Sequence, residues 1–123
     1  MRSARDRLDD VLEAIRRIER EAAAGRDQFL IDEKLQVWMI HHIQIIGEAV
    51  RAVSNELEAL APGVPWRAIV GMRHILVHDY FGIDLDEVWA VVCRDIPILK
   101  SDVEELLTRL PGEPAPSSSK AKG

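Results

Sequence analysis

The chain has 123 residues, of which 47% are hydrophobic and 30% are charged, a composition typical of one small globular domain and not of a disordered segment. A net charge of −5 argues against charge-driven binding of nucleic acid over the whole surface, and no apolar run is long enough to cross a membrane. Cys93 has no disulfide partner in the chain, which favours a cytoplasmic location, and the charged N-terminus predicts no secretory signal.

The first predicted helix follows Ser3, a residue type that caps helices, and ends near Gly25. Between them, apolar residues repeat at intervals of three and four, which is the period of one buried helical face. These residues are Leu8, Val11, Leu12, Ile15 and Ile18. Seven of the 16 basic residues stand in the first 26. They indicate either a solvated helix face or a surface that meets RNA phosphate.

A second, longer helix is predicted from Asp27 or Asp32 to about Leu60, before the stop signal Pro62-Gly63. It is apolar on more than one side. One stripe comprises Leu35, Met39, Ile46, Val53, Leu57 and Leu60, and a second set comprises Val37, Trp38, Ile40, Ile43, Ile45 and Val50. Such a helix needs burial on more than one side, so the sequence predicts a homodimer. Scattered surface residues are the alternative.

A third helix is predicted from Pro65 to about Val77 or His78, with Gly82 as its break. The next helical stretch begins at Asp84 or Asp86.

Pro97 lies inside this last stretch and is expected to kink or divide it near Asp95. Cys93 stands among apolar neighbours and is expected to be buried. Residues 1–110 therefore form one domain, an all-α, up-and-down four-helix bundle whose last helix is kinked or split. Residues 111–123 are rich in Pro, Ser and Lys and predict a flexible tail.

Polar chemistry is concentrated at the end of the third helix, in Arg73, His74, His78, Asp79 and Tyr80. His74 and His78 are four residues apart, which is the spacing of a two-histidine metal pair. A third ligand would have to come from the second helix (His41, His42 or Glu48), and because this spacing is common by chance, no metal site is predicted.

Arg73 and Tyr80 share a helical face, whereas His78 lies roughly 140° from Arg73 on an ideal helix. The three side chains converge only if the helix loosens near His78 or if a second subunit supplies the missing partner.

The spacing of Arg73, His78 and Tyr80 is the R-x4-H-x-Y signature of HEPN-domain proteins. Together with IQIIGEAVRAVS, WRAIVGMRHILVHDYFGID and VWAVVCRDIPILK, it resembles the HepT-like branch, whose members are toxins of type II toxin–antitoxin pairs with a minimal nucleotidyltransferase. The resemblance covers roughly residues 5–110. The family most often has asparagine after the motif arginine, and here that residue is His74, so no family role is carried over to it.

This resemblance implies a metal-independent endoribonuclease without a cofactor, which forms a homodimer with the two motifs facing each other across a cleft. It implies a nucleotidyltransferase antitoxin that transfers AMP to the motif tyrosine, by position Tyr80. A non-catalytic HEPN module that binds a nucleotide or only a partner protein is the alternative.

The residue types agree with RNA cleavage. Histidine titrates near neutral pH, so His78 suits general acid–base catalysis, and Arg73 suits stabilisation of charge on a phosphate. Tyr80 suits positioning of a phosphate or ribose. One histidine does not easily serve as both acid and base, so two motifs across a dimer would supply both. Asp79 either orients a side chain or lies in a solvated turn. Glu48 and Gln44 either line the cleft or form an exposed polar pair.

Overall fold

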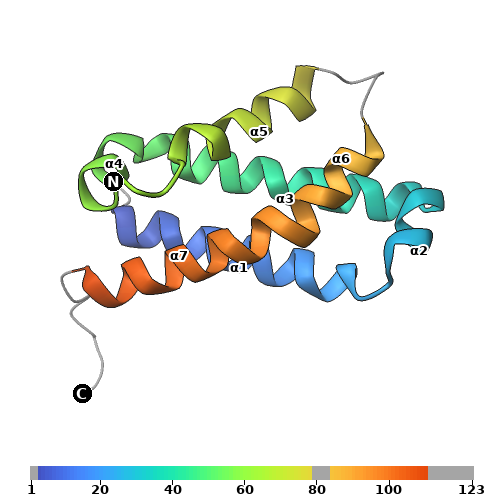
Figure 1. Cartoon of the computed structure of the whole chain (residues 1–123), viewed down its shortest axis with the longest axis horizontal. Coiled ribbons are helices and arrows are strands. Elements are labelled where there is room, and N and C mark those ends of the chain that lie inside the picture. The colour runs from blue at the N-terminus through green and yellow to red at the C-terminus, as the bar shows by residue number, and fades with distance from the viewer. Residues whose placement is uncertain (1–2, 79–83, 111–123) are drawn as a thin grey trace.

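The computed structural model describes residues 3–78 and 84–110, without the side chains of residues 73–78, and every regular element in this part is helical. The long helices α1 (Ala4–Ala22) and α3 (Glu33–Ala52) lie side by side; α5 (Trp66–His78) packs on α3, and α7 (Ile96–Arg109) packs on α1 (Figure 1). Three short helices, α2 (Arg26–Ile31), α4 (Ser54–Leu60) and α6 (Leu85–Ala90), complete the set. The predicted all-α class is confirmed. The predicted tail and the predicted break at Gly82 lie outside the described residues.

The helix starts follow the capping residues. Ser3 begins α1 with a capping box, in which its hydroxyl accepts from the Asp6 backbone N–H and the Asp6 carboxylate accepts from the Ser3 N–H. Asp32 caps α3 and Asp84 caps α6 through their carboxylates. The predicted second helix is three elements in the structure, because Asp32 ends α2 as it caps α3 and because the backbone leaves helical geometry at Val53, before α4.

The last helical stretch divides where Pro97 predicts it. A π-helical turn (Val91–Asp95) joins α6 to α7, and Pro97 stands in the first turn of α7. Proline has no N–H to give to the carbonyl of Cys93, and a π turn accommodates that missing bond. The expected burial of Cys93 is wrong, because Val91 and Val92 face the core in this turn and the thiol is exposed.

Helix α3 is buried on two sides within one chain, since α1 covers one side and α5 covers another. Its buried residues come from both predicted apolar sets, for example Met39 and Ile46 from one, and Ile43 and Val50 from the other. The apolar character of this helix therefore does not by itself require a second subunit. The homodimer remains a prediction.

The basic N-terminal region is largely a solvated helix face. Arg16 and Arg17 pair with Glu13 at 2.6 and 3.0 Å, and Arg20 pairs with Glu21 at 3.2 Å, all on α1 and all well exposed. None of the described helices has the length and hydropathy needed to span a bilayer.

Candidate active site

The predicted catalytic motif begins on the last turns of α5. The backbone of Arg73, His74 and His78 is helical as far as His78, so the helix does not loosen before that residue. On such a helix, positions 73 and 78 lie about 140° apart around the axis and about 7.5 Å apart along it. The side chains of these three residues, and all of Asp79 and Tyr80, lie outside the described residues. The structure therefore places the helix that carries the motif but not its catalytic groups.

The other end of α5 is held by Trp66. Its side chain is only 1% exposed, and its indole N–H donates to the carbonyl of Ala61 at 3.0 Å. Ile69, one turn later, is also buried, and α5 packs chiefly on α3. This packing fixes the direction in which α5 carries residues 73–78.

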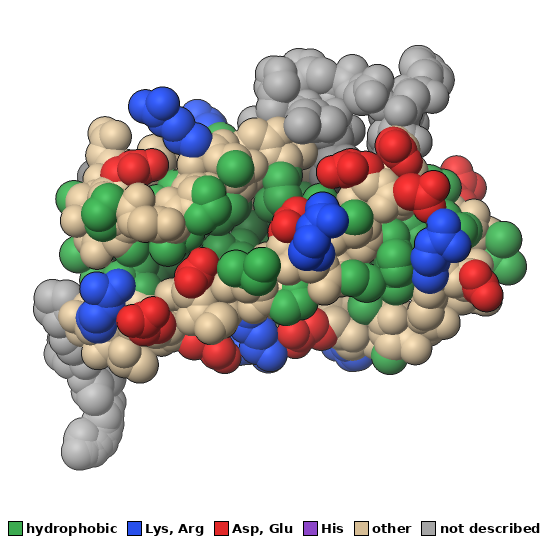
Figure 2. Space-filling model, viewed as in Figure 1, with side chains coloured by type: hydrophobic (Ala, Val, Ile, Leu, Met, Phe, Trp, Pro, Cys, Tyr) green, Lys and Arg blue, Asp and Glu red, His purple; other side chains and the backbone are tan. Residues whose placement is uncertain are grey.

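A groove of about 230 Å³, here the α5–α7 groove, lies between helices α5 and α7. Apolar residues line it, with Asp95 and Asp102 at its edge: Pro65, Ala68, Ile69, Met72, Ile98 and Leu99. Hydrophobic side chains gather in this hollow, seen from the front in Figure 2. Ile98 is 59% exposed and adjoins the other apolar residues of the groove, and this contiguous apolar lining makes the groove a candidate contact surface.

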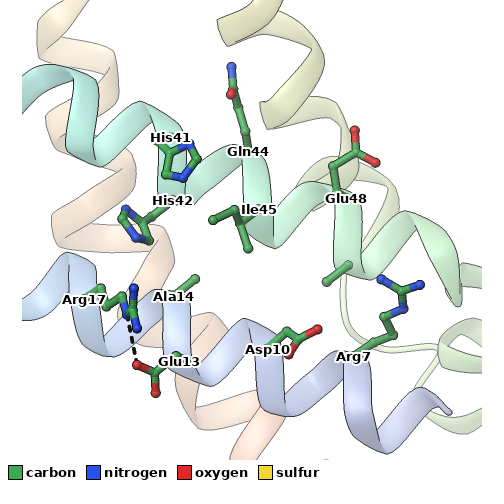
Figure 3. Close-up of a pocket in the computed structure, with 11 residues that line it drawn as sticks. Arg7, Asp10, Glu13, Ala14, Arg17, His41, His42, Gln44, Ile45 and Glu48 are labelled. Atoms are coloured by element: carbon green, nitrogen blue, oxygen red, sulfur yellow. Dashed lines mark hydrogen bonds and ion pairs between the residues drawn. The ribbon is translucent and has the colours of Figure 1, made fainter. Parts of the chain in front are cut away.

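The predicted cleft residues Gln44 and Glu48 line a different groove, which runs between α1 and α3 (Figure 3). This α1–α3 groove has a volume of about 570 Å³. Glu48 is exposed and also lies 3.5 Å from the guanidinium of Arg51. The described residues do not bring Gln44 or Glu48 together with a catalytic side chain of the motif.

The α1 side of this groove was missed by sequence reasoning. It consists of Arg7, Asp10, Glu13, Ala14 and Arg17, which recur at intervals of three and four. That recurrence of charged residues beside the apolar stripe is the signal that could have found them. It does not, however, reveal that α3 leaves an open space against this face.

His42 is the buried polar residue of the groove, with only 3% of its surface exposed. Its Nδ1 lies 2.8 Å from the Trp38 carbonyl, which is an acceptor, so Nδ1 carries the proton and donates. Burial lowers the pKa of His42, outweighing this hydrogen bond; His41, Arg17 and Arg20 lower it further. The ring is therefore neutral at pH 7, and its Nε2 is an acceptor.

Metal binding finds no support in the described residues, where no three His, Cys, Asp or Glu side chains are grouped to hold an ion. No such metal-binding group is formed by the predicted third ligands, His41, His42 and Glu48, within the described part of the chain. The pair His74 and His78 lies outside the described side chains.

Comparison with known proteins gives one family and several relatives. The model of the family described as "Ribonuclease HepT-like" matches residues 11–106. A protein of Thermococcus cleftensis named "Probable ribonuclease HepT" is 43% identical over 108 residues, which are 85% of this chain and 96% of the relative. A provisionally named RNase of Methanocaldococcus jannaschii is 40% identical over 63% of this chain and 72% of its own length. Another such relative, from Caldanaerobacter subterraneus, is 33% identical over 89% of this chain and 98% of its own length. No solved structure matches significantly.

Proposed function

The chain belongs to the HepT-like ribonuclease family, and on this premise we propose that it is the toxin of a toxin–antitoxin pair, a metal-independent endoribonuclease. The observation that carries the proposal is the family match over residues 11–106, which includes the entire motif from Arg73 to Tyr80. Relatives named as ribonucleases support the same activity.

In the proposed reaction, the 2′-hydroxyl of RNA attacks the adjacent phosphorus. A 2′-O–P bond forms, the P–O5′ bond breaks, and the products are a 2′,3′-cyclic phosphate and a 5′-hydroxyl. A general base takes the 2′-hydroxyl proton, and a general acid gives a proton to the leaving 5′ oxygen. His78 serves as acid or base, and Arg73 stabilises the negative charge on the phosphoryl oxygens. Tyr80 positions the phosphate or ribose.

A second copy of the chain would complete this site. The reaction needs both an acid and a base, whereas each motif offers one histidine. The helical backbone also supports a two-chain site, since positions 73 and 78 lie on different sides of α5. The α5–α7 groove is the surface we assign to this homodimer, because it is apolar and adjoins the helix that bears the motif. Ile98→Glu is expected to shift the protein toward monomer in analytical ultracentrifugation, whereas Ile31→Glu, on an even more exposed apolar residue of α2, is the control.

The proposed antitoxin is a nucleotidyltransferase that transfers AMP to the hydroxyl of Tyr80. Co-expression of the two proteins followed by intact mass measurement is expected to show the addition of AMP, and peptide mapping is expected to place it on Tyr80. If the antitoxin inhibits the toxin and no AMP is added, the inhibition is a steric block instead.

The activity itself is tested with purified protein and labelled RNA in EDTA. Cleavage is expected to continue in EDTA and to stop when the RNA lacks 2′-hydroxyl groups. His78→Ala is expected to abolish cleavage while the circular dichroism spectrum and the oligomeric state stay unchanged. Lys34→Ala, which removes an exposed side chain of α3 outside both grooves, is the control and is expected to retain cleavage. RNA that is bound but never cut would favour the non-catalytic module.

A further inference from the structure

The α1–α3 groove contains two polar groups that lack partners among the described residues. The Nε2 of His42 is an acceptor, and the only hydrogen bond of this side chain runs from Nδ1 to the Trp38 carbonyl. The Nε of Arg7 is a buried donor with no hydrogen-bond partner in this part of the chain. Buried polar groups in proteins are nearly always satisfied, which applies directly to the Nε of Arg7. The Nε2 of His42 is an unpaired acceptor on a side chain that is only 3% exposed, so both groups point to a ligand or ordered water in the groove.

The two unsatisfied groups lie on opposite walls. Figure 3 shows His42 on α3, directed toward α1, and Arg7 on α1 farther along the groove. Their demands are complementary, since the cation of Arg7 needs an acceptor and the neutral ring of His42 needs a donor. A ligand that satisfies both must therefore carry an anionic or acceptor group at one end and an N–H or O–H group at the other.

The space and its surroundings fit a ribonucleotide. A volume of about 570 Å³ lies within the usual range of about 300–1,000 Å³ for small-molecule sites. A phosphate supplies acceptors for Arg7, and a base amino group supplies the donor for His42. The ring of His41, which is exposed and whose centroid lies 5.0 Å from that of His42, offers a π-face beside the opening. Carboxylates also border the groove at Asp10, Glu13 and Glu48, which disfavours a purely anionic ligand.

We propose that the α1–α3 groove is a second ribonucleotide-binding site, which holds one nucleotide of an RNA strand outside the cleavage motif. The proposal rests on the proposed function in taking RNA as the substrate, and it adds a contact that selects and anchors the strand.

Binding is measured by fluorescence anisotropy with a labelled single-stranded 2′-O-methyl RNA, which lacks the attacking hydroxyl and is not cleaved. Arg7→Gln is expected to weaken binding by about tenfold, as for a lost charge-assisted hydrogen bond, and His42→Asn by about fivefold, as for a lost neutral one. Asparagine keeps a donor near the position of Nδ1, so His42→Asn preserves the bond to Trp38 and removes the acceptor in the groove. Thermal unfolding checks that both variants fold.

Arg16→Gln is the matched control. It removes the same charge from the same helix, but Arg16 is exposed and does not line the groove. Its affinity for RNA is expected to change less than twofold. An equal loss in Arg16→Gln and Arg7→Gln would reduce the effect to net charge and would overturn the proposal.

Photo-crosslinking with RNA that carries 4-thiouridine locates the contact. Trypsin releases residues 35–51, which contain His42, separately from residues 74–94, which contain His78 and Tyr80. Crosslinks to residues 35–51 that disappear in His42→Asn support the groove, whereas crosslinks confined to residues 74–94 exclude it. Full displacement of RNA by free AMP would instead identify a mononucleotide as the occupant and overturn the assignment to a strand.

These readouts are independent of cleavage. If the protein binds 2′-O-methyl RNA through the groove but cuts no RNA, the proposed ribonuclease activity fails and the binding site stands. If RNA is cut and the groove variants bind it normally, the activity stands and the binding site fails.

Discussion

Replacing Trp66 tests whether α5 is held in place mainly at its N-terminal end. The indole is 1% exposed, and its N–H donates to Ala61. Truncation of a buried tryptophan to alanine typically costs about 3–5 kcal/mol, a large part of the roughly 5–15 kcal/mol that stabilises a domain. Trp66→Phe keeps most of the ring and loses the hydrogen bond. The Ala61 carbonyl keeps its bond from the Val64 N–H at 3.1 Å, so we expect a cost of only about 2 kcal/mol.

The chain supplies two internal controls for this substitution. Trp38 is half-buried and its N–H donates to the Arg17 carbonyl at 3.0 Å, so Trp38→Phe should cost about 1 kcal/mol. Trp89 is half-buried and has no hydrogen bond to the described residues. Its ring packs at a tilt against that of Phe29, with the ring centroids 5.2 Å apart. Trp89→Phe keeps an aromatic pair and should cost under about 1 kcal/mol.

Urea denaturation followed by circular dichroism gives the free energy of unfolding of each variant. Hydrogen exchange followed by mass spectrometry reports α5 separately, and its amides should lose the most protection in Trp66→Ala. If Trp66→Phe costs no more than Trp89→Phe, or if Trp66→Ala costs less than about 1 kcal/mol, then Trp66 does not hold the N-terminal end of α5.

Three further predictions concern the ends, the interior and the surface of the bundle. Ser3→Ala removes the side-chain half of the capping box and should cost about 1 kcal/mol in urea denaturation, with an unchanged slope. Because burial holds the pKa of His42 below its ordinary 6.5, the unfolded chain binds more protons below that pH, so stability should fall as the pH drops below about 6.5. His42→Asn should remove this part of the pH dependence, as urea titrations at pH 7.5 and 5.5 would show. Cys93 should react with a water-soluble thiol reagent in the folded protein as fast as in urea, and protection in the native state would contradict its exposure.

Local signals in the sequence predicted most of the helix boundaries, since capping and proline effects act over a few residues. Ser3 begins the first helix, Asp84 begins α6, and the turn before Ile96 divides the last stretch as Pro97 predicts. The same kind of reasoning failed at Cys93, because a π turn changes which residues face the core and apolar neighbours in sequence do not show that change.

The sequence by itself determined that this protein is an all-helical domain of the HepT-like ribonuclease family, and that its motif begins at Arg73 near the end of a helix. Helical periodicity and motif spacing are properties of a contiguous segment, so they are readable without coordinates. Only the tertiary structure decided how the apolar surface of α3 is covered, because α1 and α5, which are distant in sequence, cover it within one chain. The same packing opens the groove in which the Nε2 of His42 and the Nε of Arg7 have no hydrogen-bond partner among the described residues. No local pattern specifies the space that remains between two packed helices.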